Sequence, residues 1–171
     1  MWAAREGFTE TVTALLAAPG LDVNAASGSA GWTALMWAAR EGFTETVAVL
    51  LAAPGLDVNA ASTAGGTALI LAAGEGHTET VTALLAAPGL DVNAATTAGW
   101  TALKLAVLKG HTETVTALLL VATPGLDVNA ACAVHTTTRV LGAPRACMPS
   151  ASRLRPVVSE AHLPPKKRRR S

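Results

Sequence analysis

The chain has 171 residues, half of them apolar, which is enough material for a sizeable hydrophobic core. Its formal net charge of +1 hides two oppositely charged parts: residues 1–134 carry four Lys and Arg against eleven Asp and Glu, whereas residues 135–171 carry nine against one. The two cysteines argue against a secreted disulfide scaffold, and no apolar run approaches the roughly 18 residues that span a bilayer. We therefore expect an intracellular protein, cytoplasmic or nuclear or both, without membrane contact.

The segment Asp-Val-Asn-Ala-Ala recurs through the acidic part of the chain. Its Asn stands at positions 24, 59, 93 and 129, which gives spacings of 35, 34 and 36 residues. A period in this range is typical of stacked structural repeats. We therefore divide residues 1–134 into a partial unit, 1–30, and three fuller units, 31–64, 65–98 and 99–134.

Each unit contains two apolar stripes at helical spacing. In the central unit they are Leu69, Ala72 and Ala73, then Val81, Leu84 and Leu85. Each stripe predicts a helix of about ten residues, which is too short to be stable alone in water, so the helices must pack on neighbouring units. The equivalent residues of the flanking units are Leu35, Ala38, Ala39, Val47, Leu50 and Leu51, and Leu103, Ala106, Val107, Val115, Leu118 and Leu119.

Residues with known preferences for helix ends flank these stripes. Thr67 is the expected N-cap of the first helix, and Gly76 is expected after its last turn with a positive φ. We expect Thr78 to cap the second helix, with Glu79 near the positive end of the helix dipole. Pro88-Gly89 then stops that helix.

The twelve residues from Pro88 to Gly99 show no helical pattern, which argues against the almost wholly helical tetratricopeptide unit. Thr67–Ala73, Gly76-His77 and Asp91–Ala94, with the apolar stripe between them, resemble an ankyrin repeat, and the resemblance covers Met1 to about Ala131. It implies an all-α solenoid of antiparallel helix pairs joined by finger loops. It also implies a non-enzymatic scaffold that binds another protein through the fingers and the concave face of the first helices.

The units depart from the family pattern at two places. The usual Thr-Pro-Leu-His opening reads Thr-Ala-Leu-Met at 33–36, Thr-Ala-Leu-Ile at 67–70 and Thr-Ala-Leu-Lys at 101–104. The missing histidine normally hydrogen-bonds neighbouring units, so we expect weaker coupling between them. Neutral Ser62 and Thr96 replace the usual finger aspartate, which predicts short or irregular fingers. Because Met1 aligns with Met36, we expect a piece of a longer array, and a non-functional fragment is a further alternative.

Differences between the units fall on the first helix and on the residue before its cap. We expect these positions to form a protein-binding surface, with tryptophans as anchors and lysines adding charge at one end. Neutral drift at solvent positions after duplication is the competing interpretation. The residues of the expected surface are Trp32, Met36, Arg40, Glu41, Ile70, Glu75, Trp100, Lys104, Leu108 and Lys109.

Other polar residues favour structural roles, and we expect no catalytic site, metal or cofactor. His77 and His111 follow the glycine that ends the first helix, where the family places a structural histidine. The recurring aspartates fit loop hydrogen bonding, because each copy would otherwise be equally catalytic. No zinc-ligand spacing connects the late cysteines and histidines. The recurring aspartates are Asp22, Asp57, Asp91 and Asp127, and the late cysteines and histidines are Cys132, His135, Cys147 and His162.

Residues 135–171 are rich in Pro, Ser, Ala and Arg and predict a disordered tail. The tail ends in five adjacent cations after two prolines, which resembles a nuclear localisation signal read by an import carrier. A solvated tail, loose contact with nucleic-acid phosphates and folding back onto the acidic array are alternatives. A nucleic-acid-associated or nuclear adaptor is therefore the runner-up function. The five cations are Lys166, Lys167, Arg168, Arg169 and Arg170.

Overall fold

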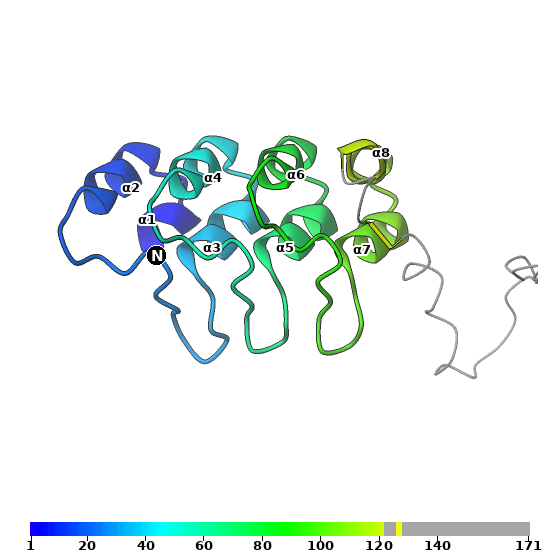
Figure 1. Cartoon of the computed structure of the whole chain (residues 1–171), viewed down its shortest axis with the longest axis horizontal. Helices are drawn as coiled ribbons and strands as arrows, with labels where there is room; N and C mark the ends of the chain where they lie inside the picture. The colour runs from blue at the N-terminus through cyan, green and yellow to red at the C-terminus, as the bar shows by residue number, and fades with distance from the viewer. Residues whose placement is uncertain (122–125, 128–171) are drawn as a thin grey trace, which may run out of the picture. The chain divides into compact units, whose positions relative to one another are not determined.

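The computed structural model describes residues 1–121 and 126–127. Within them lie eight α-helices: α1 (Trp2–Arg5), α2 (Thr9–Leu16), α3 (Ala34–Glu41), α4 (Thr44–Leu51), α5 (Ala68–Glu75), α6 (Thr78–Leu85), α7 (Ala102–Lys109) and α8 (Thr112–Val121). Figure 1 shows two rows: the first helices, α1, α3, α5 and α7, and the second helices, α2, α4, α6 and α8. The fingers project from the row of first helices, away from the second helices. The described part of the chain thus confirms the predicted all-α repeat fold.

The chain divides into two units, Met1–Thr138 and Arg139–Ser171. The second unit and the whole predicted tail, residues 135–171, lie outside the described residues.

The first helices begin and end as their sequences predict. The hydroxyl of Thr67 accepts a hydrogen bond from the backbone N–H of Ile70 at 3.4 Å, and Thr33 and Thr101 cap α3 and α7 in the same way. Gly76 follows α5 with φ of 81°, a left-handed conformation that a residue with a Cβ adopts only under strain. The helices are eight residues long, slightly shorter than expected.

The expected N-cap role of Thr78 is wrong. Helix α6 already includes Thr78, and His77 occupies the N-cap position without a side-chain cap bond. The Thr78 hydroxyl instead lies 2.9 Å from the hydroxyl of Thr114 in the next unit. The Thr78 hydroxyl, which the local sequence predicted as the helix cap, therefore forms a contact between units instead. Glu79 lies in the first turn, as predicted.

Small and large apolar residues divide the core between the two rows. Alanines of the first helices are fully buried, which lets α3, α5 and α7 lie close to one another, and larger residues of the second helices fill the remaining space. Each large side chain that is fully buried contributes about 1.5–3 kcal/mol. The residues of the two groups are Ala38, Ala39, Ala72, Ala73 and Ala106, and Val47, Leu50, Val81, Leu84 and Leu118.

An asparagine ladder connects the loops of successive units. The side chain of Asn59 donates to the carbonyl of Gly89 at 2.7 Å and accepts from the backbone N–H of Asp91 at 2.8 Å. Asn24 makes the same pair of bonds to Gly55 and Asp57. Although the histidine of the usual opening is missing, hydrogen bonds still connect neighbouring units.

The expectation of irregular fingers is wrong. The backbone N–H of Ser62 donates to the carbonyl of Gly66 at 2.9 Å, and the Ser62 hydroxyl accepts from the N–H of Gly66 at 3.0 Å. Thr96 and Trp100 repeat both bonds in the next finger. The hydroxyl residues that replace the usual aspartate therefore close each finger by accepting a backbone hydrogen bond.

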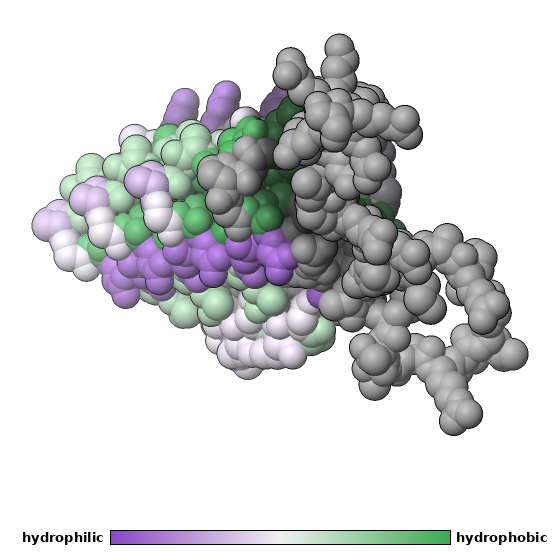
Figure 2. All heavy atoms as spheres, turned by 45° about the vertical axis from the view of Figure 1, so that its right-hand side comes forward, coloured by the Kyte–Doolittle hydropathy of each residue, from purple (hydrophilic) through white to green (hydrophobic). Residues whose placement is uncertain are grey.

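The regularity of the units is visible on the surface. Figure 2 shows apolar and hydrophilic residues in bands that run along the stack. Because equivalent residues lie at the same place in each unit, a band marks one repeat position. A surface that differs from unit to unit is therefore easy to distinguish from this background.

Candidate functional site

Two tryptophans and two arginines from two units meet where the first finger joins α3. The rings of Trp32 and Trp37 lie 4.4 Å apart, centre to centre, and are tilted by 45°. The guanidinium carbon of Arg40 lies 5.4 Å from the Trp32 ring centre and 6.0 Å from that of Trp37, and that of Arg5 lies 4.9 Å from the Trp37 ring. These distances are within the range of cation–π attraction. We name these four residues the tryptophan–arginine cluster.

Three elements hold the cluster in place. Trp32 ends the first finger, where its backbone forms a two-bond bridge with Ser27, at 2.8 and 3.3 Å. Trp37 and Arg40 lie three residues apart on α3 and so share one face of that helix. Arg5 occupies the same repeat position on α1 as Arg40 does on α3, and the stacking of the units brings it to Trp37. The geometry of the cluster thus follows from the repeat.

Charge is distributed unequally between the two rows of helices. The four Lys and Arg of residues 1–134 all lie on first helices, and these helices together with the adjoining Glu6 carry three carboxylates. The second helices carry four glutamates and no cation. Within the described residues, neither Arg5 nor Arg40 forms an ion pair. The face of the first helices is therefore the least acidic surface of an acidic array.

The structure brings together only some of the predicted surface residues. Trp32 and Arg40 meet in the cluster, and at the other end of the array Lys109 forms an ion pair with Glu75 at 3.2 Å. The ammonium group of Lys104 donates to the carbonyl of Gly99 at 2.8 Å. The remaining predicted residues are not members of the cluster; Glu41 and Leu108 are exposed and Trp100 is half-buried.

Met36 and Ile70 do not belong to the exposed surface. They are only 1% and 2% exposed, and so are core residues. The next residue, Trp37, lies at the surface of the helix instead and is half-buried. The prediction was wrong here because α3 and α5 are apolar around most of their circumference, so variation alone did not show which of two adjacent positions faces solvent.

Sequence comparison missed two members of the cluster, Trp37 and Arg5. A signal was present, since Trp2 and Arg5 repeat the pair Trp37 and Arg40 at the same spacing in consecutive units. Pairs three residues apart on a helix share a face. The contact between Arg5 and Trp37 crosses a unit boundary, so it depends on the register of stacking that the structure supplies.

Comparison with known families gives the repeat its identity. The family model of ankyrin repeats, in three copies, matches residues 1–62 and 54–132. The chain belongs to the ankyrin repeat family. Ankyrin repeats are generally protein–protein interaction modules and are typically non-enzymatic. A search of curated proteins finds no match.

The remaining polar candidates of the ankyrin array have structural partners. Nε2 of His77 lies 2.9 Å from the carbonyl oxygen of Arg40, and that of His111 lies 3.3 Å from the carbonyl of Gly74. The carboxylate of Asp57 accepts from the backbone N–H of Asn59 at 3.0 Å, and Asp22 and Asp91 do the same in their loops. These side chains support the loops and the joints between units, as the sequence predicted.

Residues 1–121 and 126–127 contain no group of three His, Cys, Asp or Glu that could hold a metal ion, and no helix there is long and apolar enough to cross a bilayer. Residues proposed or weighed for metal binding and nuclear import lie outside the described part of the chain: Cys132, His135, Cys147, His162, Lys166, Lys167, Arg168, Arg169 and Arg170.

Proposed function

We propose that the ankyrin array binds a partner protein through the face of its first helices and the adjoining finger bases, with the tryptophan–arginine cluster at the centre. The observation that carries this proposal is the contact between the tilted rings of Trp32 and Trp37, with the guanidinium of Arg40 over both rings. Tryptophan and arginine are the residue types most enriched at the energetic centres of protein interfaces. Their mutual contacts also restrict rotamers before binding, which lowers the entropic cost of association.

The chemistry of the cluster specifies the partner surface. The rings offer apolar area, while Arg5 and Arg40 form no ion pair within the described residues. A guanidinium stacked on an aromatic ring still presents N–H groups at its edge, and these can bind a carboxylate in a bidentate manner. We therefore propose that the partner presents an apolar side chain next to Asp or Glu.

Site-specific photo-crosslinking tests this proposal. A photoreactive residue at position 37 should link the array to a partner in cell extract, whereas the same residue at Thr82, exposed on second helix α6, should not. The linked partner is then identified by mass spectrometry, purified and titrated against variants. Trp37→Ala and the double variant Arg5→Ala/Arg40→Ala should each weaken binding at least tenfold, and Thr82→Ala should not.

The arginine variants protect the test against misfolding. Both arginines are exposed, so their replacement leaves the core intact, which circular dichroism would verify. Binding that is unchanged in both cluster variants, or equal cross-linking from positions 37 and 82, would reject the first-helix face as the interface.

A second proposal concerns nuclear import, and it rests on the sequence of residues 164–170. Five adjacent cations after two prolines suit the acidic groove of an import carrier, and they could also contact nucleic-acid phosphates. Residues 163–171 fused to a cytoplasmic reporter should direct it to the nucleus, and the same fusion with all five cations changed to alanine should not. A reporter that stays outside the nucleus removes this proposal, and a salt-dependent mobility shift with duplex DNA tests the alternative.

A further inference from the structure

Helix α5 carries a glycine at an interior position where its neighbours carry large side chains. Gly74 is the equivalent of Arg40 on α3 and of Leu108 on α7. Glycine is the least favourable residue in a helix interior after proline, because it loses the most conformational freedom. No contact within the described residues requires it: Gly74 is helical, and an added Cβ would lie 3.5 Å from Leu105, an ordinary van der Waals distance. The packing of the array therefore does not explain why α5 has a glycine here.

A second glycine lies beside the first. Gly66 is the equivalent of Trp32 and Trp100. In the preceding unit the guanidinium of Arg40 lies 5.4 Å from the Trp32 ring centre, so the two glycines occupy positions whose side chains would meet. The finger does not require a glycine either, since Trp100 closes its own finger with the same two hydrogen bonds to Thr96. The unit of α5 therefore lacks both side chains of a pair that the unit of α3 presents.

Apolar side chains that remain partly accessible border the place of the missing pair. A Cβ added to Gly66 would lie 4.0 Å from Leu71, one added to Gly74 would lie 3.5 Å from Leu105, and both leucines are half-buried. The backbone of the two glycines is itself buried, so the gap lies above it, where the preceding unit carries its tryptophan and arginine side chains. We name the place formed by Gly66, Leu71, Gly74 and Leu105 the central gap.

A cation lies on either side of the central gap. Neither Arg40 on α3 nor Lys104 on α7 forms an ion pair in the part of the chain that the structure describes, and the Lys104 ammonium donates to the neutral carbonyl of Gly99 at 2.8 Å. Helix α5 lies between α3 and α7 (Figure 1). Packed helices lie about 8–10 Å apart, so the two cations are separated by roughly 16–20 Å. An extended chain spans this distance with about five or six residues.

We propose that the central gap receives one large apolar side chain from an extended acidic segment of the partner, and that carboxylates on either side of that residue bind Arg40 and Lys104. This inference rests on the proposed binding through the first helices, and it names the segment that binds. The segment carries Phe, Leu or Met between Asp or Glu residues about five or six positions apart. Contact with Leu71 and Leu105 buries the apolar residue, and the two charge pairs fix the register of the segment.

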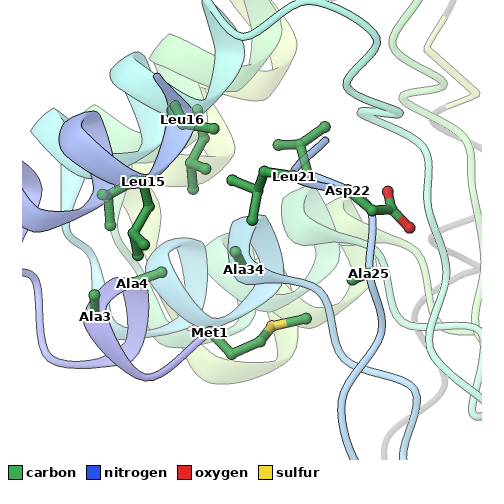
Figure 3. A pocket seen from close by; sticks show the side chains of 12 residues that line it. Met1, Ala3, Ala4, Leu15, Leu16, Leu21, Asp22, Ala25 and Ala34 are labelled. Carbon is green, nitrogen blue, oxygen red and sulfur yellow. The ribbon is translucent and has the colours of Figure 1, made fainter. Parts of the chain in front are cut away.

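The apolar hollow of the first unit does not fit such a segment. Leu15, Leu21 and Ala34 are among the residues that surround this hollow of about 150 Å³ (Figure 3). Among the described residues that line it, the one ionisable side chain is the carboxylate of Asp22. An acidic segment is therefore directed to the first helices, which carry the cations of the array.

Selection of peptides from a phage-displayed random library on the full chain tests this proposal without an identified partner. Selected peptides should carry a large apolar residue between Asp or Glu residues, and one of them is then synthesised and titrated against variants. Gly74→Leu, which restores the residue type of Leu108, should weaken binding at least about tenfold because it fills the gap. Gly74→Ala is the matched control, since one methyl group should change binding less than about threefold.

The same variants distinguish loss of binding from loss of fold. Leucine and alanine both favour helices more than glycine does, so Gly74→Leu and Gly74→Ala should each raise the urea midpoint of unfolding. A variant that is more stable and yet binds less tightly has not lost binding through misfolding. Arg40→Ala and Lys104→Ala should each weaken binding as well, and Gly66→Trp fills the gap from its other side.

The outcomes separate this inference from the proposed function. Peptide binding that persists in Gly74→Leu and Gly66→Trp but is lost in Trp37→Ala would exclude the central gap and leave the first-helix face as the interface. Binding that depends neither on Trp37 nor on the gap would reject both. Selected peptides without Asp or Glu, or a library that yields no binder, would overturn the acidic segment. Binding that is lost when the five cations of residues 166–170 become alanine would also overturn it, because the peptide would then bind the basic tail.

Discussion

Replacement of Gly76 by alanine isolates the energy of one joint between units. Gly76 has φ of 81°, and an added Cβ would lie 2.6 Å from Nδ1 of His111 in the next unit. Alanine in this left-handed conformation costs about 1–2 kcal/mol. The His111 ring must also move away from the carbonyl of Gly74, which adds about 1–3 kcal/mol for overpacking and the weakened hydrogen bond. Gly76→Ala should therefore lower the free energy of unfolding by about 2–5 kcal/mol.

Gly110 provides a matched control for the backbone term. It ends α7 as Gly76 ends α5, with φ of 76°, yet no atom lies within 4 Å of an added Cβ. Gly110→Ala should cost only the conformational strain of about 1–2 kcal/mol. The difference between the two variants measures the contact with His111.

Urea denaturation followed by circular dichroism measures both losses. Equal losses from Gly76→Ala and Gly110→Ala would refute the reasoning, because they would show that the contact of the His111 ring with Gly76 contributes nothing to the coupling of units.

Substitutions at three further positions test other contacts of the array by the same denaturation assay. Asn59→Ala removes two hydrogen bonds between loops and should cost about 1–3 kcal/mol, whereas Asn59→Asp keeps the acceptor and should cost less. Thr80→Val preserves the shape of a fully buried side chain but removes its hydroxyl contact with Thr44 at 2.9 Å, so it should cost about 0.5–1.5 kcal/mol. No loss of stability would show that a water molecule replaces the lost hydroxyl as the partner of Thr44. Lys109→Ala breaks the ion pair with Glu75, but both side chains are nearly half exposed, so the loss should stay below about 1 kcal/mol and should shrink further in salt.

Local signals made most of the fold predictable from the sequence. Thr67 and Gly76 cap α5 as expected, because a hydroxyl acceptor and a residue without a Cβ act within one turn of the helix. Thr78 and Ser62 were misjudged because their hydroxyls have partners that local rules did not consider: one bonds across a unit boundary, and the other closes a finger. The sequence predictions were therefore least accurate for side chains that have more than one available hydrogen-bond partner.

The candidate site was less predictable than the fold for a related reason. The variation between units identified the first helices as the varied surface. It did not show which face of such a mostly apolar helix is exposed to solvent, because that depends on how the helix is rotated about its axis. Met36 was therefore chosen in place of the adjacent Trp37, although only the latter reaches the surface. Arg5 joins the cluster only because stacking sets it beside a residue 32 positions later in the chain.

The distribution of differences between units bears on whether the cluster arose by drift. Drift would alter exposed positions of both rows of helices, yet the first eight residues of every second helix read Thr-Glu-Thr-Val-Thr-Ala-Leu-Leu, except in α4. On the first helices, the pair formed by Trp32 and Trp37 becomes Gly66 and Leu71 in the next unit. Among the three fuller units, the two rings therefore meet only in residues 31–64. A partner that required both rings would bind at residues 31–64 and not one repeat later, because residues 65–98 carry Gly66 and Leu71 and residues 99–134 carry Trp100 with Leu105.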